Sequence, residues 1–309
     1  MSKTISNIVF TRNRPLQLDA YLESLHRHLP PEKIQTYIIY KVELFDKQYC
    51  ELFRRFPDCV VVREKDFHDD FMKVFEMVDT QYIIFGTDDM VYFDSVDLES
   101  VLETFERFGD EIFGFTLKYD SDSLRGTIDV PVEVGMGPQQ LYKINWKKAQ
   151  NRHAAYPFDV SCTFYKTTLV REILLPVAKE RPLLKKVFAR DSLRVRFLRR
   201  IVSMKSFLAS LDTFHDPNEL EGYCYRWCKT HKRRFPSFVY FQKRCACPIQ
   251  VNRVNTTVEN PTCGTQEHTV EALNQKYMQG YRLDIEAIEQ NKPKSFVVDE
   301  RNFRLKKRE

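Results

Sequence analysis

Short apolar runs alternate with longer amphipathic segments through the first 120 residues. The runs at 8–10, 37–40, 60–62, 82–85 and 112–117 have the length and composition of buried strands. Between them, apolar residues recur every three or four positions and predict helices at 15–29, 45–56, 67–78 and 98–108. Pro15 suits the first position of the first helix. Strands alternating with helices indicate an α/β fold with a mostly parallel sheet covered by helices on both faces.

Two adjacent carboxylates, Asp88 and Asp89, directly follow the strand predicted at 82–85, and a second apolar run begins at Met90. A carboxylate taken out of water needs a partner. A hard divalent cation that bridges to a substrate phosphate is one such partner, and open α/β sheets bind ligands beyond the carboxyl ends of their strands. The pair is therefore a candidate site for Mg²⁺ or Mn²⁺. An Asp-rich turn without an ion is the alternative.

Several further segments follow in a characteristic order. The first strand leads into Thr11-Arg-Asn-Arg-Pro15, and Thr87-Asp-Asp89 ends the fourth strand. Later segments lie at 142–146, 156–167, 214–221, 249–254 and 273–284. In this order and spacing the chain resembles the nucleotide-sugar-dependent glycosyltransferases with the GT-A fold, specifically family-two-like enzymes. Thr87-Asp-Asp89 stands where that family has its DxD-type metal motif.

The resemblance implies one GT-A domain over residues 1–290 and a mostly parallel, Rossmann-like sheet with a helical C-terminal insertion. The nucleotide-binding half would be 1–120 and the acceptor half 121–290. The charged tail, 291–309, is expected to fray. The implied activity is metal-dependent, inverting, hexosyltransferase-like transfer from a nucleotide-diphosphate sugar to a hydroxyl of a glycan or lipid-linked acceptor. The alternative is a non-catalytic GT-A-like protein that binds a nucleotide or glycan.

Two departures from the family pattern bear on this interpretation. The family often has a third acid after the pair, and this chain has Met90 at that position. The metal ligand is therefore Asp88, Asp89 or both. The mid-chain block often carries Asp-Gly where this chain has Ser161-Cys162, so the sequence does not assign the donor sugar or the acceptor.

The donor side has further candidates. The resemblance makes His268 a candidate metal ligand alongside the two aspartates, because a histidine late in the chain has this role in some GT-A enzymes, and a surface histidine is its alternative. Residues near the strand ends are candidates to bind the phosphates or the nucleobase, with ordinary surface charge as the alternative for the basic ones. They are Thr11, Arg12, Arg14, Lys73 and Asp88. We expect the fold to survive replacement of either aspartate, because removing one of two like charges relieves repulsion.

Direct attack by an acceptor hydroxyl needs a general base. The candidates are Asp216, Glu219 and Glu221, which lie where Pro217 is predicted to begin a helix. Glu221 is preferred, and Asp159 is a further candidate. Acids in the first turn of a helix are also favoured by its dipole and by capping, which is the structural alternative.

Charge is unevenly distributed along the chain. The net charge is +5, yet residues 181–211 hold nine basic groups and one acid, interleaved with apolar residues at near-helical spacing. A basic amphipathic helix is typical of contact with an anionic membrane surface. A solvated face packed on the domain is the alternative. The moderate pI of 8.6 and the lack of a nucleic-acid motif argue against nucleic-acid binding.

Composition narrows the remaining classes. No apolar run approaches the ~20 residues that span a bilayer, and the first residues lack a signal-peptide core. We therefore expect a cytoplasmic protein, at most peripheral at the membrane, with reduced cysteines. Cysteines at 224, 228, 245, 247 and 263 with His231 suggest zinc, but their spacing fits poorly and small buried hydrophobes are the favoured interpretation. Phosphate-loop and dinucleotide glycine motifs are absent.

Overall fold

The computed structural model describes residues 3–121, 124, 132–133, 140–149, 154–177, 213–231, 234–252, 254, 266–293 and 303–308. The basic segment 181–211 lies outside the described residues, so its helical and membrane interpretations stay predictions. None of the helices in the described part is both long enough and apolar enough to cross a membrane.

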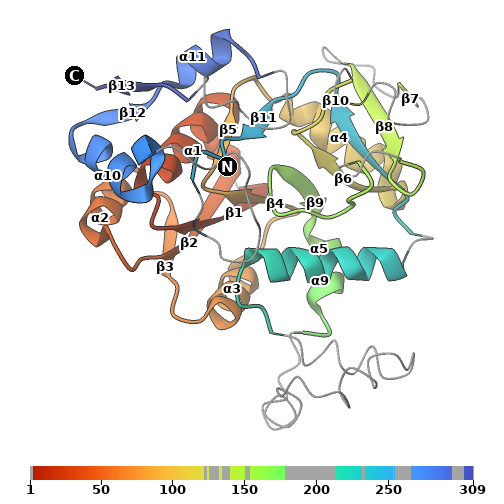
Figure 1. Ribbon diagram of the computed structural model, residues 1–309. Helices are drawn as coiled ribbons and strands as arrows, with labels where there is room; N and C mark the ends of the chain where they lie inside the picture. Colours follow the sequence, from red (N-terminus) through yellow and green to blue (C-terminus); the bar gives the residue numbers. More distant parts are fainter. Residues whose placement is uncertain are drawn as a thin grey trace, which may run out of the picture.

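A nine-stranded sheet crosses the described part of the molecule (Figure 1). In spatial order its strands are β3 (Val60–Arg63), β2 (Ile34–Lys41), β1 (Ile5–Arg12), β4 (Tyr82–Thr87), β9 (Thr163–Lys166), β6 (Ile112–Thr116), β10 (Ser237–Phe241), β8 (Leu141–Asn145) and β7 (Val132–Glu133). Strands β9 and β8 run antiparallel to their neighbours, and the other neighbouring pairs are parallel. The predicted α/β fold with a mostly parallel sheet is confirmed.

Helices cover both faces of this sheet, as predicted. Helices α1 (Pro15–His28), α2 (Asp46–Arg55) and α4 (Leu98–Phe108) bury their apolar sides in one core. Helices α3 (Phe67–Met77), α5 (Thr167–Leu174) and α9 (Pro217–Thr230) bury theirs in a second core on the opposite face. Strand β1 shows the alternation directly, because Ile5 and Val9 join the first core while Ile8 and Phe10 join the second.

Smaller elements complete the described structure. Strand β5 (Met90–Tyr92) pairs with β11 (Ala246–Pro248), which joins the two halves of the chain beside the sheet. A C-terminal group consists of α10 (Val270–Met278), β12 (Tyr281–Leu283), α11 (Ile285–Gln290) and β13 (Leu305–Lys307), near α1 in Figure 1. Short 3₁₀ turns lie at Pro31–Lys33, Gly109–Glu111 and Gln266–His268.

The end of the chain differs from the expectation. Strand β13 pairs antiparallel with β12, and Phe303 is packed in a third core with residues of α1, β5 and α10. The prediction that the charged tail frays is therefore wrong for residues 303–308. The basic residues of this segment hid a short edge strand at Leu305–Lys307, and both Leu305 and the preceding Phe303 pack in the third core.

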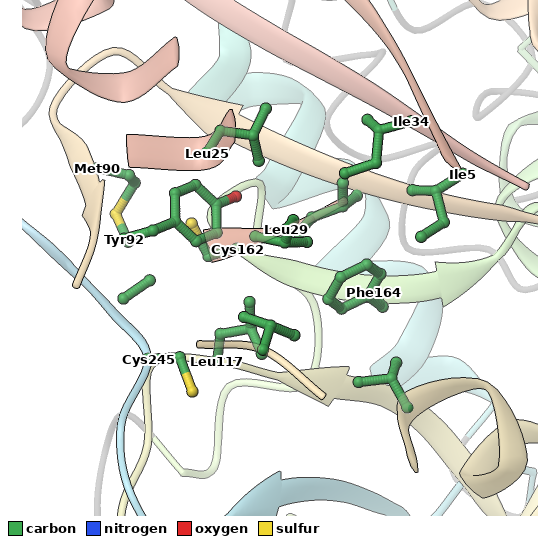
Figure 2. Packing of buried hydrophobic residues seen from close by; sticks show 14 of the residues in the cluster. Ile5, Leu25, Leu29, Ile34, Met90, Tyr92, Leu117, Cys162, Phe164 and Cys245 are labelled. Carbon is green, nitrogen blue, oxygen red and sulfur yellow. The ribbon is translucent and has the colours of Figure 1, made fainter. Parts of the chain in front are cut away.

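Cys263 lies outside the described residues, and the placement of the other cysteines in the candidate zinc group follows the apolar interpretation. Cys224 and Cys228 lie in the second core, Cys245 in the first and Cys247 in the third. Figure 2 shows Cys162 beside Tyr92 in the first core. Cys162 has φ 54°, in the left-handed region that favours glycine. Where the family often has the glycine of Asp-Gly, this chain therefore has a buried cysteine in a strained backbone conformation.

Candidate active site

The candidate residues converge because parallel strands place their carboxyl ends along one edge of a sheet. Arg12 ends β1, the pair at 88–89 follows β4, and Lys118 follows β6. Strand β9 runs the other way, so the turn at 159–162 that precedes it lies at the same edge. The Cys162 amide donates to the Phe85 carbonyl at 2.8 Å, and the Cys162 carbonyl accepts from the Leu117 amide at 3.0 Å. These two bonds hold the turn between β4 and β6.

Asp88 is the buried centre of the first cluster, with 4% of its surface exposed. Its Oδ1 accepts from Nη1 of Arg14 at 2.9 Å. Its Oδ2 accepts from Thr11 Oγ1 at 2.8 Å and from the Arg12 amide at 3.3 Å. The hydroxyl of Tyr49 lies 2.7 Å from Thr11 Oγ1 and accepts from the Arg14 amide at 2.9 Å. The partner that a buried carboxylate needs is therefore supplied by the chain itself.

The electrostatics of this pair follow from its burial. Burial raises the pKa of the Asp88 carboxyl, and the charge of Arg14 opposes that rise. For Arg14, burial lowers the pKa, but Asp88 and Asp89 raise it and the net direction is upward. The guanidinium stays charged. It also donates to the Asn252 carbonyl at 2.6 Å, so that it joins β1, β4 and the segment after β11.

Asp89 is the more open of the two acids, with its side chain 19% exposed. Thr87 Oγ1 donates to its Oδ1 at 2.7 Å, and Oδ2 lies 3.6 Å from Nη1 of Arg14. A partly exposed carboxylate at a strand end fits Mg²⁺ or Mn²⁺, which one or two carboxylates and substrate phosphates commonly hold together. Among the described residues no group of three or more His, Cys, Asp or Glu side chains is arranged to hold a metal.

His268 is connected to this cluster through Asn252. Asn252 Nδ2 donates to the His268 carbonyl at 2.9 Å, and the imidazole packs edge-on against Phe303 with ring centroids 5.0 Å apart. Its Nδ1 is buried and has no hydrogen-bond partner among the described residues. The structure links His268 to Arg14 through Asn252 and does not group it with the aspartates as a set of ligands.

The other donor-side candidates have different settings. Arg12 forms a two-pronged pair with Glu43, with Nη2 at 2.9 and 3.1 Å from its oxygens, at the exposed rim of the site. Lys73 lies on α3 with its side chain 70% exposed, 3.3 Å from Asp70. The structure therefore brings Thr11, Arg14 and the aspartates together and leaves Lys73 on an outer surface.

A second cluster is centred on Glu221 of α9. Its Oε2 accepts from the Val160 amide at 2.9 Å, which fixes the carboxylate against the turn before β9. Burial raises the pKa of Glu221, and the nearby charge of Asp159 raises it further, against the opposing effects of the Val160 amide, Lys118 and Tyr156. A carboxylate with a raised pKa is suited to accept a proton near neutral pH.

Lys118 is the residue of this cluster that sequence reasoning missed. Its Nζ lies 2.9 Å from Oδ2 of Asp159 and donates to Ser161 Oγ at 3.1 Å. Its side chain is only 16% exposed. The available signal was positional, because Lys118 follows the predicted strand 112–117 and so falls at the same sheet edge as the aspartates.

Asp216 and Glu219 cap the start of α9. Oδ1 of Asp216 accepts from the Glu219 amide at 2.9 Å, and Oε2 of Glu219 accepts from the His215 amide at 2.8 Å. The Asp216 side chain thereby satisfies an amide that the helix leaves open in its first turn, and the Glu219 side chain holds the residue just before the cap. Of the three acids proposed on this helix, Glu221 is the one that reaches the turn before β9.

Comparison with known proteins gives weak similarities. No protein-family model and no curated protein matches the chain. Among solved structures, TarS of S. aureus, also solved as residues 1–349 with UDP-GlcNAc, has 14% identity over 55% of this chain and a TM-score of 0.39. The mannosyltransferase PcManGT of Pyrobaculum calidifontis, solved with GDP-Man and Mn²⁺, has 10% identity over 59% of the chain and a TM-score of 0.34. The matches span 29% of TarS and 48% of PcManGT. Similarity at this level does not assign the chain to a family.

Proposed function

We propose that this protein is a metal-dependent, inverting glycosyltransferase with a GT-A type fold, which transfers a sugar from a nucleotide-diphosphate sugar to a hydroxyl of a glycan or lipid-linked acceptor. One observation carries the proposal. A single sheet edge holds a partly exposed carboxylate beside a fixed guanidinium, and a second carboxylate with a raised pKa on the neighbouring helix. Binding a diphosphate and removing a proton from a hydroxyl need these two kinds of group.

On the donor side, Asp89 would hold Mn²⁺ or Mg²⁺ together with the phosphates of the donor. Such a cation stabilises the negative charge that develops on a leaving nucleoside diphosphate. Asp88 acts through Arg14, because their 2.9 Å ion pair fixes the guanidinium beside Asp89. Thr11 and Arg12 would line the approach of the nucleoside. His268 remains a candidate ligand if Asn252 and its neighbours move.

On the acceptor side, Glu221 is the proposed general base. The acceptor oxygen forms a bond to the anomeric carbon while the bond from that carbon to the diphosphate oxygen breaks. The diphosphate leaves with the electron pair, and Glu221 takes the proton of the hydroxyl. The Val160 amide, which donates to Oε2, orients the carboxylate for this transfer.

A non-catalytic nucleotide- or glycan-binding protein is the second candidate. The observation in its favour is that Arg14 already satisfies Asp88, with Met90 in place of a third acid. Whether the second candidate binds a nucleotide or a glycan, only the enzyme releases a nucleoside diphosphate from a nucleotide sugar.

The direct test is thermal stabilisation by a panel of nucleotide sugars with and without Mn²⁺. A ligand at 100 times its dissociation constant adds about 2.7 kcal/mol to stability, which is readily measured. We expect Mn²⁺-dependent stabilisation by at least one donor, and its loss in Asp89→Asn. Stabilisation that is equal without metal and unchanged in Asp89→Asn would reject the proposed donor site.

A further inference from the structure

The ion pair between Lys118 and Asp159 lies between the two parts of the proposed site. Lys118 reaches it from the end of β6, and Asp159 begins the turn that leads into β9. The same turn supplies the Val160 amide to Glu221. The backbone at 159–160 is therefore held by Lys118 through the Asp159 side chain, and it holds Glu221 through the Val160 amide.

Several further hydrogen bonds fix the turn at 159–162. Asp159 Oδ1 accepts from the Ser161 amide at 3.0 Å, and Oδ2 accepts from Thr163 Oγ1 at 3.2 Å. The hydroxyl of Tyr165 bonds both the amide and the carbonyl of Asp159, at 3.0 and 2.9 Å. Lys118 adds its contacts with Asp159 and with Ser161 Oγ. The position of the Val160 amide is thus set by groups that Lys118 ties together.

We propose that Lys118 is a positioning residue for Glu221: through Asp159 and Ser161 it fixes the turn whose Val160 amide holds the Glu221 carboxylate, and its charge offsets that of Asp159. The proposal rests on the function proposed for Glu221. It assigns Lys118 no contact with the substrate. Its consequence is that the proton affinity of Glu221 depends on a balance between one cation and one anion.

The other titratable groups near Glu221 do not share in that balance. They come from each element packed around it and are Tyr156, Tyr119, Tyr165 and Cys224. Burial raises the pKa of all four, so that they are neutral at physiological pH. Arg226 of α9 lies near Gly222 and its charge acts on Cys224, whereas the charges that act on the Glu221 carboxyl are those of Asp159 and Lys118.

The experiment measures the pKa of the Glu221 carboxyl directly, by carbon-13 NMR of the full-length protein labelled at glutamate carboxyls, with the signal assigned from Glu221→Gln. Lys118→Met should raise this pKa and Asp159→Asn should lower it, each by roughly one unit, because each variant removes a charge that acts on this carboxyl. Lys118→Arg should leave it near the wild-type value. The double variant Lys118→Met/Asp159→Asn removes both charges without leaving one buried alone, so its pKa should return from the value of either single variant toward that of the wild type.

Opposite shifts in the single variants support the proposal, whereas shifts in one direction, or no shift, overturn it. If Lys118→Met does not fold, Asp159→Asn and the double variant still decide, because the first must lower the pKa and the second must restore it. The readout needs no substrate. A protein that shows these shifts but transfers no sugar would refute the proposed function and leave the coupling of Lys118 to Glu221 intact.

Discussion

Arg14 changes what the two aspartates can do. Sequence reasoning assumed that a buried carboxylate at this position needs an external cation, yet the guanidinium 2.9 Å from Asp88 meets that need. The residues are 74 positions apart, so that their spacing along the chain gave no sign of the pair. What the sequence did indicate was that both belong at strand ends of one sheet edge.

This pair leads to different expectations for the two aspartates. Asp88→Ala should destabilise the protein by about 3 kcal/mol, because it leaves the buried Arg14 guanidinium with only its longer, 3.6 Å contact to Asp89. Asp89→Ala should cost far less stability, since Asp89 is partly exposed and its contacts are fewer. Urea unfolding of both variants measures the difference. If both variants kept nearly the stability of the wild-type protein, the expectation from sequence that the fold tolerates either change would hold instead.

The buried Glu221 carboxyl should lower the free energy of unfolding when it is ionised. Burial and Asp159 raise its pKa in the folded protein, so that folding favours the protonated form. The penalty is absent below the pKa of the unfolded chain, where both states are protonated, and is complete above the pKa of the folded state.

Glu221→Gln should therefore stabilise the protein at neutral and higher pH, and the gain should fade as the pH falls through the folded pKa of Glu221. The glutamine carbonyl can still accept from the Val160 amide. This hydrogen bond is therefore kept in the variant and does not contribute to the difference in stability. Unfolding free energies measured from pH 4 to 8 test the change. A gain that grows as the pH falls has the wrong sign and would show that the carboxylate is stabilised by its surroundings.

At the scale of elements, local pattern predicted most of the first half. Helix α4 spans Leu98–Phe108, the residues that its apolar periodicity indicated, and α1 begins at Pro15. The antiparallel insertion of β9 between β4 and β6 could not be predicted, because period-two patterning does not specify a strand's neighbours. That insertion brings the turn at 159–162, and with it Lys118 and Glu221, to the aspartates.

Helix α9 offers a test that separates capping from catalysis. Asp216→Ala should cost about 1 kcal/mol, because it removes the side chain that accepts from the Glu219 amide. Glu219→Gln should keep its bond to the His215 amide and retain most of the turnover. Chemical unfolding and steady-state rates measure the two effects. A hundredfold loss of turnover in Glu219→Gln would move the role of base from Glu221 to Glu219.

At the scale of the whole molecule, ion pairs with α1 connect elements from the beginning and the end of the described chain. Arg282 of β12 lies 2.5 Å from Asp19, which also pairs with Arg55 of α2 at 2.6 Å. Arg27 of α1 pairs with Glu289 of α11 at 3.2 Å. These contacts attach the C-terminal group to α1, the helix that begins directly after Arg14. No pattern in the sequence indicated this attachment, since the ion pair between Arg27 and Glu289 joins residues more than 250 positions apart.

The packing of the tail is open to a direct check. Phe303→Ala should destabilise the protein by about 3 kcal/mol, because it empties an aromatic position in the third core. Lys307→Ala, at an exposed position of β13, is the matched control and should have little effect. Urea unfolding compares the two variants. Equal stabilities would mean that the tail frays in solution, as its composition first suggested.

The central claim is that one sheet edge serves both the donor and the acceptor, with Glu221 as the base. The most direct measurement is the turnover of Glu221→Gln alongside its affinity for a nucleotide-sugar donor that the thermal panel identifies. The account predicts a fall in turnover of roughly 10²–10⁴-fold with donor affinity preserved, because glutamine keeps the shape of the side chain but cannot take the proton. Turnover near that of the wild-type protein would contradict the account.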